Sequence, residues 1–227
     1  LPMQPDYAWT LRLAARAMHR HGLAHAYGHV SVRIDKASFL VSPAQPLGTV
    51  SRKEQGVVVP LDGELPVGAL PEVRIHREIY RNRPEIGGVV RVQPPALMAL
   101  SALGETPRAL HGLGTYFAPH PPLWPGVALV RDDAQAVKVA EMMGRNAAIV
   151  LSGNGCVVAG ETLEEAAGLT FFLEDAARLE LAVRAAGGSP RVYTDDEVKA
   201  RAVKAGMLFE RMWHYLCFED EEWEINQ

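Results

Sequence analysis

The sequence predicts one α/β domain in which helices cover both faces of a β-sheet. Short apolar runs with strand-like alternation are interspersed with amphipathic runs at helical spacing along most of the chain. The length of 227 residues fits one sizeable domain. A composition of 48% hydrophobic and 22% charged residues is ordinary for a folded protein.

The first part of the chain is expected to form a helix followed by short strands. Asp6 is a suitable N-cap for a helix at residues 7–21, where apolar residues recur at helical spacing. Two segments that alternate with period two predict a hairpin, and a third short apolar run predicts another strand. These strands are expected at residues 29–34, 39–42 and 57–60.

The middle of the chain combines a helix, a buried strand and a long loop. Pro71 suits the first turn of a helix at residues 72–82. A strand begins at Gly87 and stops at Pro94-Pro95, and a helix follows at residues 96–103. Residues 104–126 are rich in Gly, Pro and aromatic residues, and a loop of this length favours a function or an interface.

The last part is predicted to be mainly helical. Thr162-x-x-Glu165 is a capping signal for the longest of these helices. Residues 1–188 are expected to form the domain, and residues 189–227 a helical extension packed on it or on a neighbouring subunit. The acidic run at residues 219–222 is interpreted as a solvated tail. Strands are expected at 147–151 and 156–159, and helices at 132–143, 162–186 and 195–215.

Composition narrows the possible partners and the compartment. A formal net charge of −4 provides no basic surface for nucleic acid or an anionic membrane. No run approaches the roughly 18 apolar residues of a membrane helix, and the first residues lack the apolar core of a signal peptide. Cys156 and Cys217 have no metal-type spacing and are interpreted as reduced thiols. These observations predict a cytoplasmic protein.

Three groups of polar residues indicate where chemistry takes place. Glu72 and His76 are four residues apart in a predicted helix and share one of its faces. Arg91 and Gln93 end a buried strand and project to the same side of it. Asn154 lies in a tight turn between two strands, where it is expected to tolerate a positive φ.

Around these residues the chain resembles the class II aldolase/adducin family, which includes sugar-phosphate aldolases, an epimerase and several decarboxylases. The resemblance covers residues 7–188 and implies a three-layer α/β/α sandwich with a mixed, largely antiparallel sheet. It also implies a homotetramer with sites at subunit interfaces. The Gly28-His29 pair and the tail Arg211-Met-Trp213-His-Tyr215 are most similar to the decarboxylase-like branch. The matching blocks are Gly28-His29-Val-Ser-Val-Arg33, Pro71-Glu72-x-x-x-His76-x-x-Ile79-Tyr80, Arg83-Pro84-Glu85-x-x-x-Val89-Val90 and Gly153-Asn154-Gly155 up to Ala166.

The chain departs from this family at its metal site. The resemblance implies a divalent metal held by three histidines, whose positions here hold Arg91, Gln93 and Asn154. Arginine has no lone pair to give, and amides are weak ligands, so we expect neither metal nor other cofactor. A different metal site built from His29, Glu72 and His76 is an alternative.

Two further departures concern the substrate. His29 stands where the aldolases have a phosphate-binding asparagine, and Leu70-Pro71 replaces their serine pair, which points away from sugar phosphates. The tyrosine that some aldolases lend from a neighbouring subunit falls at Gly112, beside His111. Tyr116 is the nearest residue that could replace it.

These residues suggest a metal-independent carbon–carbon lyase, of decarboxylase or retro-aldol type, acting on a small oxygenated carboxylate. Arg91 would stabilise an anion, and Glu72, if burial raises its pKa, would be the general acid/base. The substrate would be oriented by a further set of residues, namely His29, Gln93, Asn154, Tyr116 and His111.

Other interpretations remain open. Arg91 and Glu72 would form a structural ion pair in a catalytically inactive, adducin-like scaffold. Asn154 would then be a turn residue, and His76 is interpreted as structural. Cyclase, hydratase or isomerase chemistry in the same pocket is a further alternative.

Overall fold

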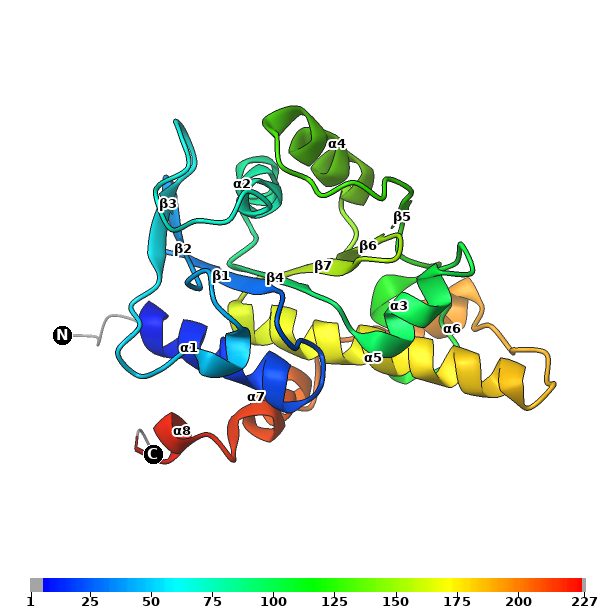
Figure 1. The fold of residues 1–227 in the computed structure, drawn as a ribbon. Coiled ribbons are helices and arrows are strands. Elements are labelled where there is room, and N and C mark those ends of the chain that lie inside the picture. The colour runs from blue at the N-terminus through cyan, green and yellow to red at the C-terminus, as the bar shows by residue number, and fades with distance from the viewer. Residues whose placement is uncertain (1–5, 226–227) are drawn as a thin grey trace.

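A seven-stranded sheet lies at the centre of the molecule (Figure 1). The structure is a computed structural model that describes residues 6–225. The strand order is β3-β2-β1-β4-β7-β6-β5, with every neighbouring pair antiparallel except β5 and β6. The strands are β1 (His29–Arg33), β2 (Ser38–Val41), β3 (Val57–Pro60), β4 (Gly88–Val92), β5 (Leu123–Trp124), β6 (Ala148–Leu151) and β7 (Gly155–Gly160).

Helices cover both faces of this sheet, so the predicted three-layer α/β/α sandwich with a mixed, largely antiparallel sheet is confirmed (Figure 1). One apolar core joins the sheet to α1 (Tyr7–Arg20), α3 (Pro95–Ser101), α5 (Leu163–Ala185) and α7 (Leu208–Cys217). A second core joins the other face to α2 (Val73–Asn82) and α4 (Asp133–Met143).

Strand alternation decides which side chains of β1 and β4 face α2. Val90 and Val92 of β4 lie in the core beneath α1 and α5, so Arg91 projects toward the opposite face, where α2 lies. On β1, Val30 and Val32 point into the same core, which leaves His29 and Ser31 on the α2 side. The antiparallel register pairs His29 directly with Arg91. Polar residues of two strands therefore meet beneath one end of α2.

The segment predicted as a long loop contains two short elements. A 3-10 helix, η2 (Gly112–Phe117), and the two-residue strand β5 lie within residues 104–126. Strand β5 pairs with β6 through only two residues, Leu123 and Trp124, which is too short for an alternating pattern to reveal. A second 3-10 helix, η1 (Leu47–Thr49), follows β2.

The single helix predicted at residues 195–215 is wrong. The chain forms α6 (Asp195–Arg201) and then α7, which are separated by residues 202–207. Gly206 and Met207 have φ values of 67° and 54°, a left-handed geometry that a continuing helix cannot contain. Within residues 6–225, no helix has both the length and the apolar character needed to cross a bilayer.

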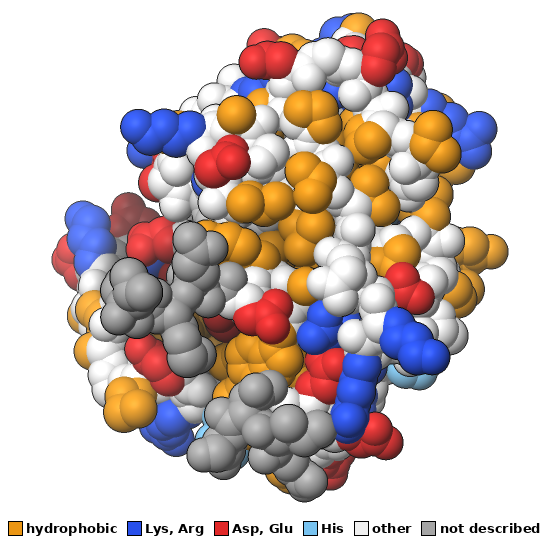
Figure 2. Space-filling view, turned by 90° about the vertical axis from the view of Figure 1, so that its left-hand side faces the viewer, with side chains coloured by type: hydrophobic (Ala, Val, Ile, Leu, Met, Phe, Trp, Pro, Cys, Tyr) orange, Lys and Arg blue, Asp and Glu red, His pale blue; other side chains and the backbone are white. Residues whose placement is uncertain are grey.

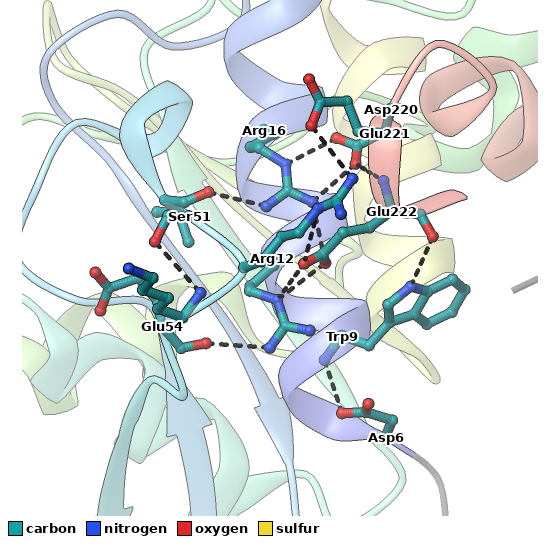
Figure 3. A network of polar contacts seen from close by, with 12 residues as sticks. Asp6, Trp9, Arg12, Arg16, Ser51, Glu54, Asp220, Glu221 and Glu222 are labelled. Carbon is teal, nitrogen blue, oxygen red and sulfur yellow. Dashed lines mark hydrogen bonds and ion pairs between the residues drawn. The ribbon is translucent and has the colours of Figure 1, made fainter. Parts of the chain in front are cut away.

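The acidic run after α7 is not a solvated tail, which corrects a second prediction. Asp220 and Glu222 are buried and bind three arginines of α1, two of which are labelled in Figure 3. Arg16 Nη2 lies 2.8 Å from Asp220 Oδ1, and Arg12 Nε lies 2.9 Å from Glu222 Oε2. Arginines four residues apart form one stripe on α1, and this stripe holds the segment that leads into α8 (Glu221–Ile225). The arginines are Arg12, Arg16 and Arg20.

Asp220→Asn is expected to lower the free energy of unfolding by about 2–4 kcal/mol, because it leaves Arg16 and Arg20 without their common carboxylate. Burial raises the pKa of Asp220, but its hydrogen bonds to Arg16, Arg20 and the Glu222 N–H, together with the charge of Arg16, lower it more, so the net direction is downward. The stabilisation is therefore present above the ordinary carboxyl pKa and is lost as the pH falls through the folded value. Urea unfolding at pH 7 measures the effect.

Glu221→Gln is the matched control, because the Glu221 side chain is 89% exposed. It should leave the unfolding midpoint unchanged. Equal midpoints for the two variants would mean that the arginine stripe of α1 does not stabilise the C-terminal segment.

Hydrophobic side chains gather on the face of the molecule at the β3 edge of the sheet (Figure 2). Val58 of β3 is exposed, as are Val67 and Leu70 in the segment that connects β3 to α2. An edge strand with exposed apolar neighbours is suited to contact with another protein chain.

Candidate active site

A cavity of about 660 Å³ opens where β4 ends and α2 begins. Five of the residues singled out from the sequence line it, and they come from four different parts of the chain. These are His29, Glu72, Arg91, Gln93 and Asn154. The structure therefore brings most of the predicted site together.

Short-range geometry explains how these side chains reach the cavity. Glu72 is the residue immediately before α2, after Pro71, so its side chain lies at the helix N-terminus. Gly28 precedes His29 with a φ of 142°, and a Cβ there would lie 2.9 Å from the Arg91 carbonyl oxygen. Only glycine permits this close approach of the two strands.

Asn154 is held by the turn between β6 and β7. Its side-chain oxygen accepts a hydrogen bond of 2.8 Å from Gln93 Nε2. The expectation of a positive φ at Asn154 is wrong, because the left-handed positions of this turn are Gly153 and Gly155. The two amides thus form one polar wall of the cavity.

Arg91 and Glu72 form an ion pair at the cavity floor. Arg91 Nε lies 3.1 Å from Glu72 Oε2, and Nη2 lies 3.5 Å from Oε1. The Arg91 side chain is only 3% exposed, against 15% for Glu72. Within residues 6–225, Arg91 Nη1 has no hydrogen-bond partner, and the Nε contact lacks hydrogen-bond geometry. The guanidinium therefore keeps donor capacity for a ligand.

Glu72 is ionised at neutral pH. Burial raises the pKa of Glu72, but the neighbouring N–H of His29 and the charge of Arg91 lower it more, so it lies below its ordinary value. This differs from the expectation that burial raises the pKa, because the sequence could not show how close the two donors lie. Glu72 is therefore a proton acceptor that lies next to the cationic Arg91.

His29 belongs to a buried polar chain that runs from the cavity under α2. His29 Nδ1 lies 2.8 Å from His76 Nε2, and His76 Nδ1 lies 2.6 Å from Ser31 Oγ. Ser31 Oγ also lies 2.9 Å from the Tyr80 hydroxyl. Burial is the largest cause that lowers the pKa of both His29 and His76, so both imidazoles are neutral at pH 7.

Tyr116 and His111 lie away from this cavity in the same chain. The Tyr116 hydroxyl donates a hydrogen bond of 2.8 Å to the Val203 carbonyl oxygen, and its ring stacks on Phe172. His111 precedes η2, and its Nδ1 is buried without a hydrogen-bond partner in the described part of the chain. The cavity of one chain is thus built without these two predicted residues.

The donor set does not fit the divalent metal that the family resemblance implies. Arg91, Gln93 and Asn154 supply a cation and two amides where a metal needs imidazoles or carboxylates. His29 Nδ1 and His76 Nε2 face each other at 2.8 Å, so they do not converge on a common point with Glu72. Among the described residues, no group of three His, Cys, Asp or Glu suits a metal.

Residues 10–181 match the Class II Aldolase and Adducin N-terminal domain family. The chain belongs to this family. A relative, the 3,4-dihydroxyphthalate decarboxylase of Terrabacter sp. (strain DBF63), is 31% identical over 192 residues, which cover 78% of this chain and 80% of that protein. The 3-oxo-tetronate 4-phosphate decarboxylase of Haemophilus influenzae is 31% identical over 181 residues, or 76% and 84% of the two chains.

Solved structures agree with this assignment. L-Fuculose-1-phosphate aldolase from Thermus thermophilus superposes with a TM-score of 0.73 and 28% identity, over 83% of this chain and 100% of that chain. The predicted family and its decarboxylase-like branch are confirmed, and the chain is an enzyme, a lyase of the decarboxylase/aldolase type.

Several residues at or behind the cavity were missed by the sequence analysis. Arg131, just before α4, lines the cavity, and it has no hydrogen-bond or ion-pair partner among the described residues. No local pattern marks Arg131, because only the packing of α4 beside α2 brings it there. Ser31 and Tyr80 could have been found, since strand and helix spacing place them on the faces that hold His29 and His76.

Proposed function

We propose that this protein is a decarboxylase-type lyase that acts on a small, oxygenated, unphosphorylated carboxylate without a divalent metal. The observation that carries this proposal is the buried Arg91, which lines the cavity beside the ionised Glu72 and keeps donors without hydrogen-bond partners among the described residues. A guanidinium stabilises an oxyanion through parallel charged hydrogen bonds, which is part of what a metal ion would otherwise do.

The cavity favours a flat anionic substrate. Arg91 and Arg131 outnumber the single carboxylate of Glu72, and both histidines of the buried chain are neutral. Apolar side chains at the cavity, Tyr27 and Leu129, suit the face of a ring. A hydroxylated aromatic carboxylate has both features, and the Terrabacter relative is named for a substrate of this kind.

Glu72 acts first as a base and then as an acid in this reaction. It accepts the proton of a substrate hydroxyl and returns it to the carbon that bears the carboxylate. The bond from that carbon to the carboxylate then breaks, its electron pair returns to the ring, and carbon dioxide leaves. The remaining phenolate oxygen takes a proton from water.

Arg91 contacts the oxygen that gains negative charge rather than the carboxylate that leaves. A cation on the departing carboxylate would stabilise the starting state and slow the reaction. Gln93 and Asn154, joined by their hydrogen bond, hold the substrate's polar edge in this orientation.

The assembly we propose is a cytoplasmic homotetramer with sites between subunits. The exposed apolar face at the β3 edge supplies a contact surface, and Tyr116 and His111 would approach a neighbour's cavity. Cys156 and Cys217 are free thiols, in keeping with a reducing compartment. Light scattering of the purified protein measures the subunit number, and a monomer would contradict this assembly.

Elemental analysis and thermal-shift titration of the purified protein test the proposal together. We expect no stoichiometric zinc or manganese and no thermal shift on adding either ion. Hydroxybenzoates are expected to raise the Tm by a few degrees, since a ligand that binds only the folded state stabilises it. Aliphatic hydroxy acids of similar charge should raise it less, because they leave the apolar side of the cavity unfilled.

Stoichiometric metal would overturn the metal-free chemistry and restore a metal-dependent lyase with unusual ligands. Release of carbon dioxide from a hydroxylated aromatic carboxylate decides the reaction type. A protein that binds these compounds without turnover would instead be a binding protein built on the lyase fold.

A further inference from the structure

We propose that Tyr80, Ser31 and His76 fix the tautomer of His29, so that its Nε2–H donates a hydrogen bond toward the cavity. In this chain of hydrogen bonds Tyr80 donates to Ser31, Ser31 to His76, and His76 to His29. His29 is thereby held with its proton on Nε2, pointing at the substrate. His76, Ser31 and Tyr80 are positioning residues, and His29 is the group that touches substrate.

Burial and distance make the chain of contacts continuous. Ser31 and His76 are fully buried, Tyr80 is 1% exposed and His29 is 2% exposed. The three links measure 2.9 Å from Tyr80 to Ser31, 2.6 Å from Ser31 to His76 and 2.8 Å from His76 to His29. Each imidazole nitrogen of His76 contacts one of these partners, and a neutral ring carries a proton on only one nitrogen. The proton position in one hydrogen bond of His76 therefore decides the donor in its other hydrogen bond.

At the cavity, the surroundings of His29 set the direction in which these hydrogen bonds are donated. His29 Nε2 lies 3.8 Å from Glu72 Oε2 and has no hydrogen-bond partner among the described residues. An unprotonated Nε2 would direct a lone pair at an ionised carboxylate, which is repulsive in a buried site. A proton on Nε2 leaves Nδ1 as an acceptor in a neutral ring, and His76 Nε2 must then be the donor to it.

The Tyr80 end of this series of hydrogen bonds requires the same direction of donation. Burial raises the pKa of Tyr80, so its hydroxyl keeps its proton. Ser31 Oγ is the side-chain partner within reach of that hydroxyl. If Tyr80 donates to Ser31, the serine proton is free to point at His76 Nδ1. Both ends therefore select the tautomer in which each histidine carries its proton on Nε2.

The consequence concerns the substrate group at the cavity floor. His29 Nε2 and Arg91 Nη1 are two buried donors without partners among the described residues. His29 Nε2 lies 3.8 Å from Glu72 Oε2, and Arg91 contacts the same oxygen through Nε. Both residues line the same cavity, and two such donors suit an oxygen with several lone pairs, such as a phenolate, an enolate or a carboxylate oxygen. Resting on the proposed function, this assigns His29 to hold the oxygen on which charge develops.

Nitrogen-15 NMR of the histidine rings tests the tautomers without any substrate. Long-range proton–nitrogen spectra distinguish a protonated Nε2 from a protonated Nδ1, and His29→Gln and His76→Gln assign the two rings by loss of their signals. At pH 7 we expect Nε2–H in both rings. A proton on Nδ1 of His29, or an imidazolium at either ring, would overturn the proposal whatever the protein catalyses.

Paired variants at His76 test the consequence for substrate. His76→Gln keeps an amide N–H near the position of Nε2, whereas His76→Leu has no donor for His29. We expect His76→Leu to lower kcat/KM about 10- to 100-fold and His76→Gln to restore most of it. Equal losses in both variants would indicate a role in packing only, and this outcome would contradict the proposal.

Ser31→Ala provides a gentler perturbation, because it removes only one oxygen. His76 Nδ1 then loses its donor, and only the Glu72 end of the hydrogen-bond chain still favours Nε2–H. The nitrogen shifts of His76 are therefore expected to move part of the way toward those of the other tautomer. Unchanged shifts in Ser31→Ala would show that Ser31 does not set the proton position. If the wild-type tautomers are as expected and no carboxylate is turned over, the proposed function fails while the hydrogen-bond chain stands.

Discussion

Glu72→Gln is expected to lower kcat by about 100- to 10,000-fold while leaving substrate binding intact or tighter. The glutamine keeps the shape of the side chain but cannot accept the substrate proton. It also removes the negative charge that lies 3.1 Å from Arg91 Nε, so an incoming anion no longer competes with Glu72 for the guanidinium. Steady-state kinetics should therefore show a fall in kcat without a rise in KM.

The pH dependence of the wild-type enzyme follows from the same carboxylate. Because the pKa of Glu72 is lowered from its ordinary value of 4.5, Glu72 remains a base throughout the mildly acidic range. Activity is expected to decline only as the pH falls below 4.5, through the folded pKa, provided that the fold survives. An acid limb near pH 6 would mean that another group limits the reaction.

Glu64→Gln is a suitable control, because Glu64 is exposed in the turn after β3. It should leave both kcat and KM unchanged. A Glu72→Gln variant with the activity of this control would exclude Glu72 as the acid/base and leave the ion pair with Arg91 as its only role.

Much of the fold could be predicted because its signals are local. Asp6 and Thr162 cap α1 and α5 as expected, each accepting a hydrogen bond from a backbone N–H three residues on. Alternation along residues 29–34 predicted β1. The break before α7 was missed, because one glycine in a helical pattern, here Gly206, does not by itself end a helix.

The acidic segment after α7 shows a different limit of sequence reasoning. Asp220 and Glu222 are as polar as a solvated tail, and only contacts across some two hundred residues bury them against α1. The arginine stripe of α1 was visible as spacing, but a stripe alone does not say which carboxylates it meets.

The candidate site was predictable where strand register decides it and hidden where packing decides it. His29 and Arg91 are paired across β1 and β4, so both arrive at one place once the sheet forms. Arg131 depends on how α4 lies beside α2, which no residue spacing reveals. The lowered pKa of Glu72 likewise depends on distances to His29 and Arg91 that exist only in the folded chain.

Arg91→Met is expected to abolish stabilisation by hydroxybenzoates and to lower kcat/KM about 100-fold or more. The methionine fills much of the same volume and removes both the charge and the free donors. With Arg91 absent, the pKa of Glu72 should rise, since burial raises it and one of the groups that lower it is gone. The acid limb of any residual activity would then move to higher pH.

The stability of the Arg91→Met variant distinguishes a substrate-binding role of Arg91 from that of a structural ion pair. A buried pair that holds the fold together costs about 3–5 kcal/mol when one partner is removed. Arg91 lacks good hydrogen-bond geometry to Glu72 at Nε and has no partner at Nη1 among the described residues, so its desolvation is poorly compensated. We therefore expect the Tm of Arg91→Met without ligand to equal or exceed that of the wild type.

Two comparisons make the Arg91 result decisive. Arg145→Met, at a side chain that is 81% exposed, should change neither Tm nor binding. The double variant Glu72→Gln with Arg91→Met should be at least as stable as the wild type, because it removes both buried charges together. If Arg91→Met alone loses several kcal/mol and the double variant recovers them, the pair is structural. If Arg91→Met keeps its stability and loses only ligand binding, the buried guanidinium is retained for the substrate.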